Sequence, residues 1–160
     1  MINKVMQEMI QYFGQDVRRI NHALKVYGFA GCIARGENMI AQEVFVVELA
    51  AILHDIGIKQ AEKKYNSSSG HYQEVEGPAI ARNILSGTDL DNEIIERVCF
   101  IIGHHHSYQK IDGPDFQVLV EADFLVNICE DSMEKHSVER IRKQYFKTHT
   151  GISMIESMYL

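Results

Sequence analysis

The sequence contains no apolar run long enough to cross a membrane and no excess of positive charge. No uninterrupted apolar segment approaches about 18 residues, so a membrane-spanning helix is not expected. The N-terminus lacks a basic stretch followed by a long apolar one, which argues against a secretory signal peptide. The net charge of −6 at pH 7 argues against an extended nucleic-acid-binding surface, although one local basic pocket is compatible with it.

Cysteine is also scarce, and its three copies are far apart: Cys32, Cys99 and Cys129. Their number is odd and they form no CxxC pair, so a zinc site held by cysteine is not expected. We predict that all three are free thiols in the core. Free thiols are typical of a reducing compartment, which predicts a cytoplasmic protein.

Apolar residues recur at helical spacing through most of the chain, and no segment shows strand-like alternation or an internal repeat. The stripe of Val5, Met9 and Phe13 predicts a first helix that Gly14 ends, and Asp16 is placed to begin the second. We therefore predict an all-α protein in which roughly seven or eight helices form a single domain over residues 1–160. Further helices are expected near residues 44–57, 77–87, 91–106, 116–129, 138–146 and 152–160.

Two features between these helices carry turn signals. Residues 59–70 are polar and include the consecutive serines Ser67 to Ser69, so we expect a loop or mobile lid there. Pro78 follows Gly77 and is predicted to occupy the first position of the next helix, where its missing N–H does no harm.

The most apolar segment runs from Val44 to Leu53 and contains one polar residue, Glu48. This composition predicts a helix that is buried nearly all round. His54 and Asp55 follow directly, and Gly57 is expected to cap the helix at its C-terminus. A buried carboxylate needs a partner, and an adjacent imidazole and carboxylate can pair with each other or bind a metal ion together.

Two further polar residues lie on apolar helix faces. His22 precedes Val26 on one such face, and Asp123 is flanked by Val120 and Val126 on another. Taken alone, His22 is better explained as a core histidine hydrogen-bonded to a backbone carbonyl. Together with His54 and Asp55, however, the two residues complete a donor set of two imidazoles and two carboxylates. Such a set suits one divalent ion (Mn²⁺, Fe²⁺, Co²⁺, Ni²⁺ or Zn²⁺) and tolerates Mg²⁺, and it leaves positions open for water and substrate.

These four residues follow, in order, the H…HD…D signature of the HD superfamily of metal-dependent phosphohydrolases. The flanking sequences agree, including Ala-Ala-Ile-Leu-His-Asp-Ile-Gly around the doublet and Glu-Ala-Asp at Asp123. The chain resembles this family over about residues 16–127, and the helices of residues 134–160 are expected to pack on that region. The resemblance implies an α-helical HD fold with His22, His54, Asp55 and Asp123 as metal ligands. It also implies hydrolysis of a phosphate ester or anhydride, most often in a nucleotide.

The chain departs from the two-metal members of the family at one position. Those enzymes usually carry a further histidine where this sequence has Gln73. His71, Glu74 and Glu76 are nearby alternatives, but none matches the family position cleanly. This departure favours one tightly held ion, with a second ion remaining an option.

The next helix end does match the two-metal pattern, because His104 and His105 stand where such enzymes carry a histidine pair. We predict that they face the substrate or a weak second ion; the alternative is that they only cap a helix C-terminus. The family also often has a lysine three residues after the HD aspartate. Here Ile58 occupies that position and Lys59 follows it.

The predicted mechanism is attack of a metal-activated water on phosphorus, with Asp55 as both a ligand and an orienter of that water. Arg19, Lys59, His104 and His105 are candidates to hold phosphate charge or to protonate the leaving group. A surface salt bridge is the alternative role for Arg19.

Two other functions remain open. The domain would be a nucleotide-sensing module if its metal were purely structural, and a di-iron oxygenase if two irons were bound, although Gln73 counts against the latter. The expected partner is a small phosphorylated molecule, with a nucleotide as one candidate, and neither a membrane nor an extended nucleic acid is expected. The sequence leaves the oligomeric state, the substrate and the metal open.

Overall fold

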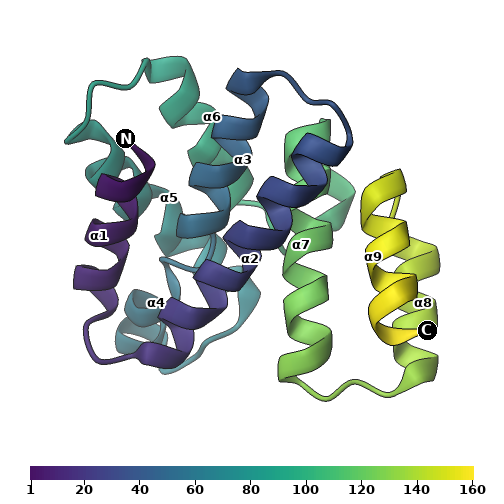
Figure 1. Cartoon of the computed structure of the whole chain (residues 1–160). Coiled ribbons are helices and arrows are strands. Elements are labelled where there is room, and N and C mark those ends of the chain that lie inside the picture. Colours follow the sequence, from purple (N-terminus) through teal and green to yellow (C-terminus); the bar gives the residue numbers. More distant parts are fainter.

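The computed structural model describes residues 1–160 of the chain. It is built of α-helices and one short 3-10 helix, with no β-strand, which confirms the predicted all-α class (Figure 1). None of the helices has the length and apolar composition needed to span a membrane. The elements are α1 (Ile2–Phe13), α2 (Val17–Gly36), α3 (Ala41–Leu53), α4 (Ile58–Tyr65), α5 (Gly70–Ser86), α6 (Asn92–Ile102), the 3-10 helix η1 (Tyr108–Lys110), α7 (Pro114–Glu130), α8 (Lys135–Tyr145) and α9 (His149–Tyr159).

The connection between α1 and α2 forms as its sequence predicts. Gly14 has a φ of 65° and donates its N–H to the carbonyl oxygen of Ile10, which closes α1. The carboxylate of Asp16 accepts a hydrogen bond from the backbone N–H of Arg19 and so caps α2. This cap fixes the first turn of α2, which carries Arg19 and leads to His22.

Helix α3 lies at the centre of the fold. Every residue from Val46 to Leu53 is buried, as the apolar composition of this segment predicts. The helix packs against α1, α2, α6 and α7 (Figure 1). Its C-terminal end therefore lies inside the molecule and delivers His54 to a fully buried position.

The predicted end of α3 is wrong by several residues. The helix stops at Leu53, His54 is its C-terminal cap, and a turn leads through Asp55 to Gly57, which caps the start of α4. Gly57 is therefore no C-cap. A Cβ atom at this position would lie 2.5 Å from the carbonyl oxygen of Gln73 on α5. The absence of a side chain lets the turn approach the α5 backbone closely.

The polar segment after this turn is not all loop. Residues Ile58–Tyr65 form α4, although Ala61 is its one buried side chain, and Asn66 ends the helix in the left-handed conformation with a φ of 51°. No apolar stripe in this segment indicates a helix. Its position is set by packing against α5.

The predicted start of α5 is also wrong. The helix begins at Gly70, so Pro78 lies in its interior and not at its first position. A proline there removes one helical hydrogen bond, which is why the sequence favours a helix start. Gly103, just past the end of α6, faces the Pro78 ring: a Cβ atom at Gly103 would lie 3.0 Å from Pro78 Cγ. Tertiary packing thus outweighs the local signal.

Cysteine placement matches the prediction at one position of three. Cys99 on α6 is buried, whereas Cys32 and Cys129 are exposed, so the expectation of core thiols is wrong for these two. Both lie on long helices, α2 and α7, in which some positions face the core and others face outward.

The helices α8 and α9 form a C-terminal hairpin that packs against α7 (Figure 1). Glu121, fully buried on α7, accepts hydrogen bonds from the backbone N–H groups of Lys147 and Thr148, at 2.6 and 2.9 Å. These two amides lead directly into α9. Glu121 therefore ties the hairpin to the helix that carries Asp123.

Candidate metal centre

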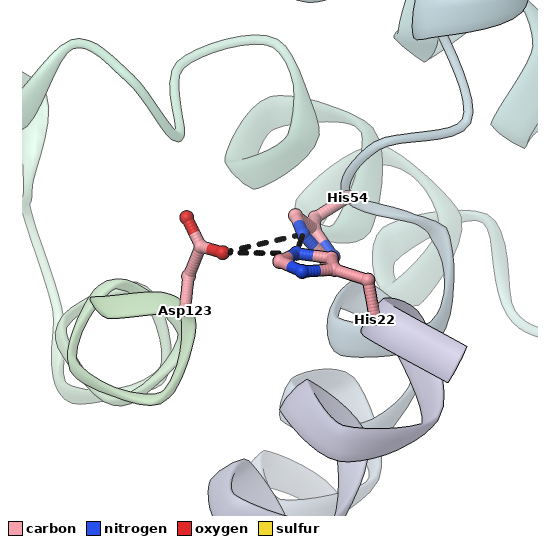
Figure 2. Close-up of side chains that lie close together, drawn as sticks. All are labelled: His22, His54 and Asp123. Carbon is pink, nitrogen blue, oxygen red and sulfur yellow. Dashed lines mark hydrogen bonds and ion pairs between the residues drawn. The ribbon is translucent and has the colours of Figure 1, made fainter. Parts of the chain in front are cut away.

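Side chains from three helices meet at one point in the interior. His22 comes from α2, His54 from the end of α3 and Asp123 from α7 (Figure 2). The Nε2 atom of His22 lies 3.1 Å from Nε2 of His54 and 3.2 Å from Oδ1 of Asp123. His54 Nε2 lies 3.6 Å from the same carboxylate oxygen. Two imidazole nitrogens and one carboxylate oxygen thus converge on a small volume. We call His22, His54 and Asp123 the first group.

Hydrogen bonds from the Nδ1 atoms orient the imidazole rings of the first group. His54 Nδ1 donates to the carbonyl oxygen of Ala51 at 2.9 Å, and His22 Nδ1 donates to Oε2 of Glu130 at 3.0 Å. A carbonyl and a carboxylate can only accept, so Nδ1 carries the proton in each ring. Each Nε2 atom then points into the group, where a metal ion would displace its proton and take up its lone pair, which is the arrangement of metal-ligating histidines.

Asp55 lies between this group and a second one. Its Oδ2 atom is 3.7 Å from His22 Nε2 and 3.6 Å from His54 Nε2, while its Oδ1 atom is 3.4 Å from Nε2 of His105. The ligand atoms of Asp55, His105 and His106 lie within 4.8 Å of one another. These three residues are the second group. His105 is oriented in the same way as His54, since its Nδ1 donates to the carbonyl oxygen of Ile102 at 2.8 Å.

The histidines and carboxylates in and beside the first group stabilise one another's charged forms. Burial alone would lower the pKa of His22, but its hydrogen bond to Asp123 and the charges of Asp123 and Asp55 raise that pKa to about 9. Burial would raise the pKa of Asp123, yet the hydrogen bonds from His22 and His54 hold it well below its usual range. The partly buried carboxylates therefore remain ionised and require positive charge nearby, which imidazole protons or a divalent cation can supply.

Three buried polar atoms have no hydrogen-bond partner: His105 Nε2 and His106 Nε2 in the second group, and Gln73 Oε1 on α5. Burial and the neighbouring His105 lower the pKa of His106 to about 4, so its ring is neutral and keeps a lone pair. Buried polar atoms normally have a partner in the protein, a water or an ion. Unpaired imidazole nitrogens beside an ionised carboxylate match the donors that divalent transition metals prefer. The residues present thus fit a metal ion.

A polar cavity of about 450 Å³ opens over His22 and Asp55. It is bounded by the start of α2, the start of α4 and the end of α7, so it leads from the first group to the surface. Of the ten residues that line it, one is hydrophobic. Besides His22 and Asp55, the lining residues are Asp16, Arg18, Arg19, Ile58, Ser68, Asn127, Glu130 and Asp131.

The family model of the HD domain matches residues 19–147. The chain belongs to the HD domain family. A crystal structure of a predicted HD superfamily hydrolase from an uncultured Thermotogales bacterium resembles this HD domain with a TM-score of 0.67 and 22% sequence identity. The match covers 99% of this chain and 83% of that chain, and at this identity it supports the fold alone. No curated protein sequence gives a match.

The structure brings all four signature residues of this HD domain together, but it places two other candidates elsewhere. Lys59 donates to the carbonyl oxygen of Tyr12 at 2.7 Å, and its Nζ lies 5.2 Å from the centre of the Tyr12 ring. His104 donates from Nδ1 to the carbonyl oxygen of Phe100 at 2.7 Å. Neither residue belongs to the two groups or lines the cavity.

Arg19 does line the cavity, but its guanidinium is already paired. It forms two hydrogen bonds to Glu62 on α4, at 3.1 and 2.6 Å, and an ion pair with Asp16 at 2.9 Å. The salt bridge that the sequence left as an alternative is therefore present.

Sequence reasoning missed two residues of the site. His106, and not His104, joins His105 in the second group, because α6 ends at Ile102 and the histidines lie in the turn that follows. The run of three histidines was the available signal, but it does not tell which ring turns inward. Glu130 lies 108 positions from His22, and no local pattern indicated their contact.

Proposed function

We propose that this HD domain is a metal-dependent hydrolase that acts on a phosphate ester or anhydride of a small molecule. The observation that carries the proposal is the convergence of imidazole nitrogens and ionised carboxylates beside an open polar cavity that His22 and Asp55 line. A structural metal site is normally closed by protein ligands, whereas a catalytic one keeps room for water and substrate.

The residues that would hold the ion are His22, His54, Asp55 and Asp123. When bound there, a divalent cation lowers the pKa of a water toward neutrality and offsets charge on phosphoryl oxygens. Asp55 lines the cavity as well as touching both histidine groups, so its carboxylate can accept a hydrogen bond from the attacking water and orient it.

The remaining site residues have supporting roles. Glu130 and the Ala51 carbonyl hold the two imidazole rings, and Asn127 donates from Nδ2 to Oδ1 of Asp123 at 2.9 Å. Arg18 is exposed at the cavity mouth and can attract an anionic substrate, since long-range attraction of this kind raises the rate of encounter.

A second ion is favoured by one specific observation. The two oxygens of Asp55 face different groups, Oδ2 toward His22 and His54 and Oδ1 toward His105. Asp55 would therefore help to hold an ion at each group. Two-metal hydrolysis and di-iron oxygenase chemistry both need a second ion, so the number and identity of the ions distinguish these functions from a sensor with one inert ion.

The test is a turnover screen with protein stripped by chelator and reloaded with Mn²⁺, Fe²⁺, Co²⁺, Ni²⁺, Zn²⁺ or Mg²⁺. Substrates would include sugar phosphates, nucleoside mono-, di- and triphosphates, and phosphodiesters. The proposal expects hydrolysis only with metal, seen as released phosphate or pyrophosphate, or as a phosphomonoester where the substrate is a phosphodiester. It also expects this activity to be lost in Asp123→Asn but not in the matched surface variant Asp89→Asn. Bound metal without turnover of any substrate would favour the sensor, and oxygen consumption by protein holding two irons per chain would favour the oxygenase.

A further inference from the structure

We propose that the cavity over the metal ligands takes a phosphorylated polyol, such as a sugar phosphate, with one phosphate group and no nucleobase. This inference rests on the proposed function for the place of the phosphate, which is set against His22 and Asp55. It narrows the substrate class from the chemistry of the cavity mouth.

The mouth offers hydrogen-bonding groups that have no partner within the protein. The guanidinium of Arg18 and the carboxylate of Asp131 are exposed and form no ion pair or hydrogen bond, and the hydroxyl of Ser68 forms none either. Asn127 donates its amide N–H to Asp123, and its amide oxygen has no partner. Unpaired donors and acceptors are therefore both present in the lining. Hydroxyl groups both donate and accept, so a chain of them matches this surface.

The other charged groups at the mouth already have ion-pair partners within the protein. Arg19 is held by Asp16 and Glu62, and Glu130 is held by His22 and by Lys25 at 3.0 Å. Arg18 is thus the one unpaired cation in the lining, and Asp131 is its one unpaired anion. A second or third phosphate in this cavity would find no spare positive charge other than Arg18, and the charge of Asp131 would repel it. A monophosphate avoids this repulsion.

The lining also offers little surface for a nucleobase. Binding of a flat aromatic ring relies on aromatic or aliphatic walls, and Ile58 is the one hydrophobic residue of this cavity. An aromatic cluster outside this lining packs against itself: Phe124 stacks on Tyr145 with ring centres 4.9 Å apart, and Tyr108 lies 4.6 Å from Tyr145. Tyr108 and Tyr145 line a separate cavity. A base attached to the ligand would therefore project toward water and add no affinity.

Three ligands test separately whether a nucleobase adds affinity and whether a second phosphate lowers it. They are ribose 5-phosphate; AMP, which adds a base; and ADP, which adds a base and a second phosphate. Their dissociation constants would be measured by calorimetry with the full chain at a fixed concentration of free Mn²⁺. We expect ribose 5-phosphate to bind at least as tightly as AMP, and ADP to bind several-fold more weakly than AMP. AMP binding more than about tenfold tighter than ribose 5-phosphate, or ADP binding tighter than AMP, would overturn the inference, because tenfold is the size of one net hydrogen bond or buried contact.

Asp131→Ala supplies the internal test. Removing this carboxylate deletes a partner for ligand hydroxyls and also a charge that repels the second phosphate. The preference for ribose 5-phosphate over ADP should therefore fall roughly tenfold, while Asp89→Ala, a surface control outside the cavity, should leave it unchanged. An unchanged preference in Asp131→Ala overturns the inference. The assay needs no turnover, so a protein that binds ribose 5-phosphate with this selectivity but hydrolyses nothing would contradict the proposed hydrolase and still support the ligand class.

Discussion

Glu130 determines how the imidazole of His22 is presented. The carboxylate accepts from His22 Nδ1 at 3.0 Å and is itself held by Lys25, also at 3.0 Å. A metal-ligating histidine whose second nitrogen donates to a carboxylate is both oriented and made more basic. His54 and His105 use backbone carbonyls for the same purpose, so His22 is the ring whose orientation depends on a replaceable side chain.

We predict that Glu130→Ala weakens Co²⁺ binding about 10- to 100-fold, the usual cost of losing such a partner. Glu130→Gln should restore part of the affinity, because its amide oxygen can still accept from Nδ1. Co²⁺ absorption spectra during titration report both affinity and ligand geometry. Glu139→Ala, an exposed change on α8, is the matched control. Equal affinity in all four proteins would show that Glu130 does not position the ligand.

The three consecutive histidines allow a second residue-level test. His105 and His106 belong to the second group, whereas His104 is bonded to the Phe100 carbonyl outside it. The double variant His105→Ala/His106→Ala should reduce phosphate release, and any uptake of a second ion, while the first ion still binds. His104→Ala should change neither ion uptake nor turnover. A double variant that binds no metal at all would mean that the two groups form a single site.

The residues of the first group could be predicted from sequence because each is a charged or ionisable residue in an apolar stretch, and because their order matches a known signature. His106 and Glu130 could not. Their roles depend on how the turn after α6 folds and on how the end of α7 lies beside α2. The predicted role of Lys59 as a phosphate ligand is not supported for the same kind of reason, because the first turn of α4 directs its side chain to the Tyr12 carbonyl and away from the cavity.

At the scale of elements, the helices with an apolar stripe were predictable and the polar ones were not. α4 buries a single side chain, Ala61, and so carries no periodic signal. α5 contains Pro78, whose local preference for a helix start is overridden because the first turns of this helix pack against α4 and the turn at Gly57. Local propensity is a weak guide where tertiary contacts set the boundary.

Gly57 provides a direct test of this packing. A Cβ atom there would lie 2.5 Å from the Gln73 carbonyl oxygen and 2.7 Å from the Gly77 nitrogen, and both are backbone atoms that cannot turn aside. Gly57→Ala should therefore lower the free energy of unfolding by about 1–3 kcal/mol. Gly28→Ala, at an exposed α2 position with nothing within 4 Å, should instead raise it by up to about 1 kcal/mol. Urea denaturation in the presence of chelator measures both, and a neutral Gly57→Ala would show that the turn does not need this close approach.

At the scale of the whole molecule, the first group joins helices that are already neighbours. α2, α3 and α7 pack against one another pairwise, and each contributes one residue of the group. An ion bound there would cross-link the centre of the fold. Because only the folded chain assembles these ligands, binding stabilises the native state by about 4 kcal/mol at a metal concentration of 1,000 times Kd. For a chain of this size that corresponds to a rise in Tm of roughly 8–16 °C.

Metal binding by this cluster can be measured by titrating chelator-stripped protein, with Tm and bound metal determined on the same samples of wild type and Asp123→Asn. We expect wild type to take up at least one Mn²⁺ or Co²⁺ per chain and its Tm to rise as the site fills. In Asp123→Asn the ion would be left with two neutral imidazoles and one carboxylate, so uptake and the rise in Tm should both fall sharply. Wild type that takes up no metal, or an Asp123→Asn protein that binds it as tightly, would contradict the assignment of this cluster as a metal site.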